Sequence, residues 1–136
     1  QELPEGIDLV FSRQAAEVEA NEYRGDFIAL VADDGVEPFY SAFERHAASL
    51  SLSTVTLAME LEAMANPLMD VLHFSDHRSF WYEGYSAIML TDSAWLRNTA
   101  YHCWEGVDSV DRLDQLFATK IIRSTVFGVA EVAQIQ

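Results

Sequence analysis

The chain has 136 residues, of which half are hydrophobic and 22% are charged, so its composition excludes a disordered or collagen-like protein. Its 22 acidic residues outnumber 8 basic residues and give a formal charge of -14, which argues against binding to nucleic acid or to an anionic membrane surface. The single cysteine, Cys103, permits no intrachain disulfide. We therefore expect one packed globular domain spanning residues 1–136.

The chain shows no targeting or membrane-spanning signal. Residues 1–6 contain no initiating Met, no basic region and no apolar stretch, so no signal peptide is predicted and the chain resembles an excised segment. Charged residues interrupt the most apolar late segment, residues 116–135, so a bilayer span is not expected. We expect a soluble protein and leave its compartment open.

The first third of the chain predicts a helix, a strand and a second helix. A short helix is possible from Ser12, as its N-cap, to Asn21. Residues 26–32 form a continuous apolar run, typical of a strand buried on both faces. Pro38 suits the first turn of an amphipathic helix predicted over residues 37–49, which we expect to cover the sheet.

The middle of the chain predicts a second strand and a short helix. β-Branched and apolar residues favour a strand over 52–57, and residues 60–74 are predicted to be a connection with one or two helical turns. Ser75 is then expected to cap a short helix that ends at Gly84. Two aromatic side chains of this helix, Phe80 and Trp81, are predicted to point inward.

The last third predicts a strand, a loop and a long helix. Residues 86–91 are too apolar for an exposed edge strand, and residues 92–110 form a polar loop of a length that is often functional. The helix predicted over residues 111–133 carries two apolar stripes, so either one of them contacts another layer or subunit, or the second is a few exposed valines. The first stripe is Leu113, Leu116, Phe117 and Ile121, and the second is Ile122, Val126 and Val129.

The polar residues around the third strand do not by themselves form a complete catalytic set. His73 and His77 have helical ligand spacing, but the cap predicted at Ser75 separates them, so we do not expect joint metal ligation. Consecutive side chains such as those of His102 and Cys103 point to opposite sides, which favours a buried structural cysteine over a thiol nucleophile. The residues alone indicate an α/β domain with a polar cluster at one end of the sheet.

Three consecutive motifs resemble the C-terminal half of the zinc aminopeptidases of metallopeptidase family 28. The motifs are Ser75-Asp76-His77-x-x-Phe80-Trp81, a strand led by Gly84 and ending in Thr91-Asp92, and Arg97-Asn98-x-x-Tyr101-His102. Residues 25–31 resemble the family strand that precedes a covering helix. The resemblance implies a layered sheet of about three or more mostly buried strands covered by helices, part of a phosphorylase/hydrolase-like zinc peptidase fold.

The resemblance also assigns roles to five residues. It implies that His102 is a metal ligand and that Tyr101 donates a hydrogen bond to the oxyanion that develops on a peptide carbonyl. It gives Asp76, His77 and Asp108 supporting roles. The other ligands of the family's two-zinc site, an early His-x-Asp and a Glu-Glu pair, would precede residue 1, and one histidine cannot hold such a site.

The sequence therefore predicts the C-terminal half of a zinc-dependent, aminopeptidase-type peptide hydrolase that binds zinc weakly and is inactive alone. Its expected partners are a peptide substrate when the site is completed, a missing N-terminal half or further copies of the chain. The alternative is a non-catalytic α/β module that uses a sheet edge or the second stripe of the last helix for partner binding or self-association. An unrelated hydrolase using Asp76 and His77 is the third alternative.

Overall fold

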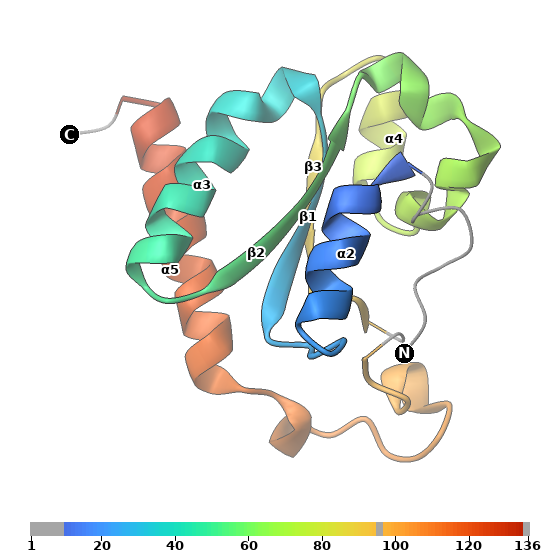
Figure 1. The fold of residues 1–136 in the computed structure, drawn as a ribbon, viewed down its shortest axis with the longest axis vertical. Helices are drawn as coiled ribbons and strands as arrows, with labels where there is room; N and C mark the ends of the chain where they lie inside the picture. Colours follow the sequence, from blue (N-terminus) through green and yellow to red (C-terminus); the bar gives the residue numbers. More distant parts are fainter. Residues whose placement is uncertain (1–9, 95–96, 135–136) are drawn as a thin grey trace.

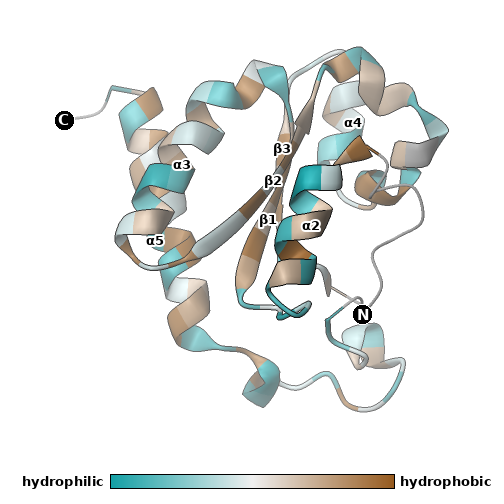
Figure 2. Cartoon of the chain, viewed as in Figure 1, coloured by the Kyte–Doolittle hydropathy of each residue, from teal (hydrophilic) through white to brown (hydrophobic). Residues whose placement is uncertain are grey.

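The computed structural model describes residues 10–94 and 97–134, which form an α/β fold around a small mixed sheet (Figure 1). The central strand, β1 (Phe27–Asp33), pairs in parallel with β2 (Ser53–Met59) and antiparallel with β3 (Ile88–Thr91), giving the order β2-β1-β3. The continuous apolar run of β1 is buried on both faces, as predicted, and is largely brown in Figure 2. The α/β class predicted from the sequence is confirmed.

One face of the sheet is covered by α3 (Glu37–Ser49) and α5 (Gln115–Val132), which lie side by side in Figure 1. The two helices approach closely at Gly128, where an added Cβ would lie 3.3 Å from the backbone nitrogen of Phe43. The buried residues of this core come from β1, from α3 and from the residue before β2: Ile28, Leu30, Phe43, Ala47 and Leu52.

The opposite face is covered less regularly. It packs against α2 (Ser12–Ala20), α4 (His77–Tyr82) and two 3₁₀ segments, Leu61–Ala65 and Pro67–His73, all on the far side of the sheet from α3 in Figure 1. The buried residues of this second core are Phe11, Val31, Met64, Met69, Leu72 and Trp81. The sheet thus lies between two layers of helical elements, which agrees with the predicted α/β class.

The three predicted strands are present, but their bounds and the environment of the third differ from the prediction. β1 extends to Asp33 and β2 extends to Met59, because both residues continue the parallel ladder. β3 begins only at Ile88 and lies at an edge of the described sheet with half-buried residues. The prediction from apolar content that this strand would not be an edge strand is therefore wrong.

The predicted helix over residues 37–49 is confirmed, whereas the predicted caps of the two shorter helices are wrong. Phe11, not Ser12, is the N-cap residue of α2, and it makes no side-chain capping bond. Asp76, not Ser75, occupies the N-cap position of α4, again without a side-chain bond. The ends of both helices are therefore determined by packing against the sheet rather than by capping chemistry.

The direction of α4 corrects a second prediction. Trp81 is buried in the core, as expected, but Phe80 is 55% exposed. Adjacent residues of a helix lie about 100° apart, so a helix of six residues against one sheet face buries only one of two neighbouring aromatic rings. Gly84 ends this segment with a positive φ of 76°, as predicted.

The last helix begins later than predicted. Asp114 caps α5 by accepting hydrogen bonds from the backbone N–H groups of Leu116 and Phe117, so Gln115 is the first helical residue. Leu113 and Leu116 are exposed, which reduces the predicted first stripe to the half-buried Phe117 and Ile121. The second stripe is exposed, as predicted. No helix within the described ranges is long and apolar enough to cross a membrane.

Candidate functional site

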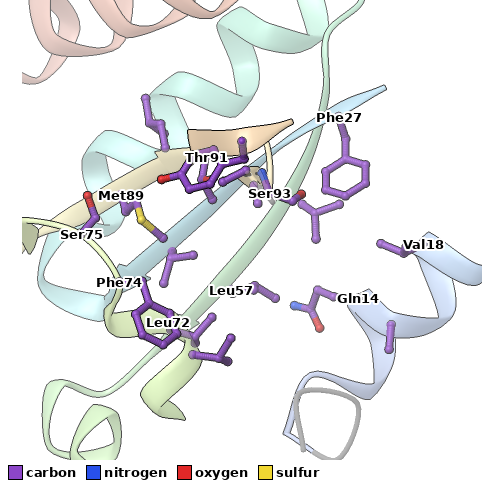
Figure 3. Close-up of a pocket in the computed structure, with 18 residues that line it drawn as sticks. Gln14, Val18, Phe27, Leu57, Leu72, Phe74, Ser75, Met89, Thr91 and Ser93 are labelled. Atoms are coloured by element: carbon purple, nitrogen blue, oxygen red, sulfur yellow. Dashed lines mark hydrogen bonds between the residues drawn. The ribbon is translucent and has the colours of Figure 1, made fainter. Parts of the chain in front are cut away.

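A mostly apolar cavity of about 250 Å³ lies between α2 and the open face of the sheet (Figure 3). In the figure, Gln14 and Val18 of α2 form one side, and Leu72, Phe74 and Ser75 form the opposite side. The strands supply its floor with Phe27, Ala29, Val31, Val55, Leu57, Met89, Leu90 and Thr91.

The polar groups of this cavity are few and uncharged. They are Gln14, Ser75, Thr91, Ser93 and Tyr101, and no acidic or basic side chain belongs to the described lining. A mostly apolar pocket with a small number of convergent polar groups is the usual form of a small-molecule or side-chain binding site. The cavity is therefore the candidate functional site of the described chain.

The three sequence motifs around β3 meet at this cavity. Ser75 belongs to the first motif, Thr91 ends the second and Tyr101 belongs to the third, and all three residues line the same space. They come from the segment before α4, from β3 and from the loop after it, respectively. The structure thus brings together residues that lie up to 26 positions apart in the sequence. The spacing of the motifs along the chain did not predict that these residues would share a cavity.

Tyr101 and His102 lie in a short 3₁₀ turn, Tyr101–Cys103, with their ring centroids 4.2 Å apart. His102 has a left-handed backbone, with φ 53° and ψ 26°, and its side chain is exposed. Cys103 also has a positive φ and is exposed, so the predicted buried cysteine is wrong. Non-glycine residues in this region are uncommon and often mark a functional turn.

Asn98 organises the loop that carries Tyr101. Its Oδ1 accepts hydrogen bonds from the backbone N–H of Ala100, at 3.1 Å, and from Nη1 of Arg112, at 3.3 Å. Its Nδ2 donates to Oδ1 of Asp108, at 3.3 Å. Asp108 is exposed, and its hydrogen bond with Asn98 helps to hold this loop.

His77 and Asp76 face different surroundings. His77 is buried, stacks edge-on against Trp81 with ring centroids 4.5 Å apart, and places Nε2 2.7 Å from the carbonyl oxygen of Leu72. Burial lowers the pKa of His77 and the nearby His73 lowers it further, against the opposing effects of the Leu72 hydrogen bond and Asp76. Asp76 is exposed. The two neighbours do not converge on one atom, as the sequence argument expected, and neither lines the cavity.

Asp33 is a structural anchor that sequence reasoning missed. It is 1% exposed and accepts hydrogen bonds from Nε1 of Trp81 at 2.9 Å, from the N–H of Ala87 at 2.7 Å and from the N–H of Gly35 at 2.8 Å. Burial raises the pKa of Asp33, but hydrogen bonds from Ala87, Ser86, Trp81 and Gly35 together hold it below its ordinary value. The only sequence signal was an acidic residue directly after a buried apolar run.

The predicted polar cluster at one end of the sheet is divided between two ends. Asp33 and α4 lie at the carboxyl end of β1, whereas Arg97 donates a hydrogen bond to the carbonyl of Phe27 at the amino end. β3 runs antiparallel to β1, so the segments before and after it lie at opposite ends. The cavity occupies the sheet face between them.

The described residues offer one candidate metal ligand of the predicted site, His102. Within residues 10–94 and 97–134, no three His, Cys, Asp or Glu side chains are grouped so that they could hold a metal ion. His73 ends a 3₁₀ segment and His77 begins α4, so the two do not share a helix, as predicted. An exposed imidazole fits zinc as one ligand, and the described residues do not supply the remainder of a site.

Comparison with known proteins gives one informative match. The chain is 31% identical over 104 residues, or 76% of its length, to the uncharacterized protein YfbL of Escherichia coli strain K12. The matched region spans 30% of that protein's length. No family model matches the chain, and no solved structure matches it.

Proposed function

We propose that the chain is the C-terminal half of a zinc-dependent, aminopeptidase-type peptide hydrolase domain. The observation that carries the proposal is that Ser75, Thr91 and Tyr101, one from each motif of the resemblance, line a single cavity. A functional site built from separate segments needs this convergence, because residues that act on one substrate must reach the same space.

Tyr101 is the residue of this chain that acts on the substrate. It belongs to the wall of a cavity whose described lining has no charged side chain, and its phenol O–H can donate a hydrogen bond there. A donor fixed in an apolar site stabilises the negative charge that develops on a carbonyl oxygen more than it would in water. Tyr101 therefore orients the substrate carbonyl and stabilises it during attack.

His102 supplies one metal ligand beside that donor. Its side chain is exposed, so its imidazole is accessible to a metal ion. Zinc, when bound, polarises a carbonyl oxygen and lowers the pKa of a water molecule, but a catalytic zinc usually needs three protein ligands. We expect residues outside the described chain to complete the site, and we expect this chain alone to bind zinc weakly and to be inactive.

The test is turnover of an aminoacyl-anilide by the full-length gene product and by its Tyr101→Phe variant. We expect kcat to fall roughly 100- to 1,000-fold, the usual cost of removing an oxyanion donor, with the zinc content unchanged. Tyr85→Phe is the matched control, because Tyr85 is exposed and outside the cavity lining. A Tyr101→Phe enzyme with unchanged kcat would contradict the proposed role.

The second candidate is a non-catalytic module that associates through α5. Ile122, Val126 and Val129 are 63%, 58% and 49% exposed, which leaves an apolar stripe on the surface of a long helix. Light scattering at high concentration tests this candidate, because Val126→Lys should shift the chain to the monomer while Ala118→Lys, at an exposed site, should not. A clean wild-type monomer would count against self-association.

The coding sequence distinguishes the two candidates. Coding sequence upstream of residue 1 with His-x-Asp and Glu-Glu would favour the hydrolase, and a start codon there would favour the module.

A further inference from the structure

Arg97 joins the loop that carries Tyr101 to the first residue of β1. Its Nη2 donates a hydrogen bond to the carbonyl oxygen of Phe27 at 3.0 Å, and its guanidinium carbon lies 5.3 Å from the centroid of the Phe27 ring. Phe27 is also a wall of the cavity. The same residue therefore receives the Arg97 side chain and faces the space that Tyr101 lines.

The backbone around Arg97 is shaped to admit this side chain. An added Cβ at Gly25 would lie 2.9 Å from Cδ of Arg97, closer than real Cβ atoms approach other heavy atoms. Gly25 has no positive φ in the structure, so a Cβ at this position would meet the Arg97 side chain, which would have to shift. The Arg97 side chain is half-buried, which limits its freedom to move elsewhere.

A short hydrogen-bonded turn connects Arg97 to Tyr101. The N–H of Tyr101 donates to the carbonyl of Asn98 at 3.0 Å, and Oδ1 of Asn98 accepts from Ala100 at 3.1 Å. Ala100 is fully buried between these residues. This turn begins at Asn98, directly after Arg97, and is closed by its own hydrogen bonds, so it offers a short path by which a displacement of the Arg97 backbone reaches Tyr101.

We propose that Arg97 is a positioning residue that holds Tyr101 against the cavity through its contacts with Phe27. The expected effect of Arg97 on kcat rests on the proposed function, whereas its effect on the position of Tyr101 does not. A planar guanidinium both donates to the Phe27 carbonyl and lies against the ring, and a lysine ammonium cannot reproduce that pair of contacts. Gly25→Ala displaces the Arg97 side chain without changing its chemistry.

The test uses ¹⁹F NMR of the chain labelled with 3-fluorotyrosine. The chain has five tyrosines, and Tyr101→Phe assigns the signal of interest. We expect Arg97→Ala, Arg97→Lys and Gly25→Ala each to shift the Tyr101 resonance toward that of free fluorotyrosine. Resonances of the exposed Tyr82 and Tyr85 should stay in place, and Arg24→Ala, at an exposed site near the same strand end, should shift none of them.

Chemical rescue separates positioning from general support of the fold. Millimolar propylguanidinium, which supplies the missing group, should restore the Tyr101 resonance in Arg97→Ala. It should not restore the resonance in Gly25→Ala, where the new methyl group fills the required space. An unmoved Tyr101 resonance in Arg97→Ala and Gly25→Ala would overturn the proposal, and so would a shift of all five resonances together.

Activity distinguishes this proposal from the function on which it rests. In an active gene product, Arg97→Ala should lower kcat by about tenfold or more with a smaller change in KM, because misplacing a donor weakens the transition state most. If Arg97 controls the Tyr101 resonance but Tyr101→Phe leaves turnover unchanged, the function fails and the positioning stands. If Tyr101→Phe abolishes turnover but Arg97→Ala leaves the Tyr101 resonance unchanged, the proposed positioning role is wrong and the proposed function stands.

Discussion

The two ends of β1 are each held by one charged side chain, but the two anchors differ in burial and in what they connect. Asp33, at the carboxyl end, is 1% exposed and accepts hydrogen bonds from several other groups of the chain, one of them on α4. Arg97, at the amino end, is half-buried and donates to one backbone carbonyl. A buried carboxylate with several donors stabilises the whole fold, whereas a partly exposed guanidinium fixes one loop.

The largest effect should come from Asp33→Ala. The substitution leaves the Trp81 indole and the backbone N–H groups of Ala87 and Gly35 without their acceptor. The buried Trp81 donor left unsatisfied costs about 1–3 kcal/mol and the two part-buried N–H groups add less, so we expect a loss of about 3 kcal/mol in the free energy of urea unfolding. Asp34→Ala removes the same charge from the exposed neighbouring position and should change stability by less than about 0.5 kcal/mol. Equal losses of stability in Asp33→Ala and Asp34→Ala would contradict the role of Asp33 as a buried anchor.

The pH dependence of unfolding should sharpen the description of the Asp33 end. Burial lowers the pKa of His77 in the folded chain, so the unfolded chain binds a proton more readily below the ordinary histidine pKa of about 6.5. Stability should therefore fall as pH drops from 7 to 5, by about 1.4 kcal/mol for each unit by which the pKa is lowered. The pKa of Asp33 is also lowered, so its contribution is lost only below its ordinary value, about 3.9.

His77→Gln should flatten the stability curve between pH 7 and 5. His102→Gln is the matched control, because it makes the same substitution at an exposed histidine. The measurement is the urea midpoint at half-unit steps of pH. A slope that persists in His77→Gln would assign the pH dependence to another group.

The smallest effect on stability should come from the Arg97 end. Arg97→Ala removes one hydrogen bond to Phe27, and we expect about 1 kcal/mol of destabilisation, well below the Asp33→Ala loss. Arg24→Ala, which removes an exposed ion pair with Asp26, should cost close to zero. Hydrogen exchange should localise the Arg97→Ala change to the loop before Tyr101, and exchange that rises uniformly would contradict a local anchor.

Local sequence signals predicted the elements that depend on composition. The apolar run of β1 predicted a strand buried on both faces, and Pro38 with its following apolar spacing predicted α3 with its observed bounds. The direction of Phe80 and the N-cap of α4 could not be predicted in this way, because a six-residue helix takes its orientation from the sheet it packs against. Asp33 looked like a turn residue because its partners lie 48 and 54 positions away.

The candidate site was predictable only in part. A resemblance, not local physics, singled out Tyr101 and His102. The cavity depends on α2 lying over strands whose lining residues follow it by as many as 77 positions, from Gln14 to Thr91, and no local pattern contains that packing. Arg97 was named only as part of a motif, and its role became apparent from its contacts with Phe27 and Gly25.

Zinc stoichiometry measured together with aminoacyl-anilide turnover tests the central claim most directly. The full-length gene product should bind zinc and hydrolyse the substrate, His102→Ala should lose both, and His46→Ala, on α3 away from the cavity, should keep both. The present chain alone should bind no zinc tightly. A full-length product without zinc or turnover, or a His102→Ala variant that keeps both, would contradict the assignment of this chain to a zinc peptidase.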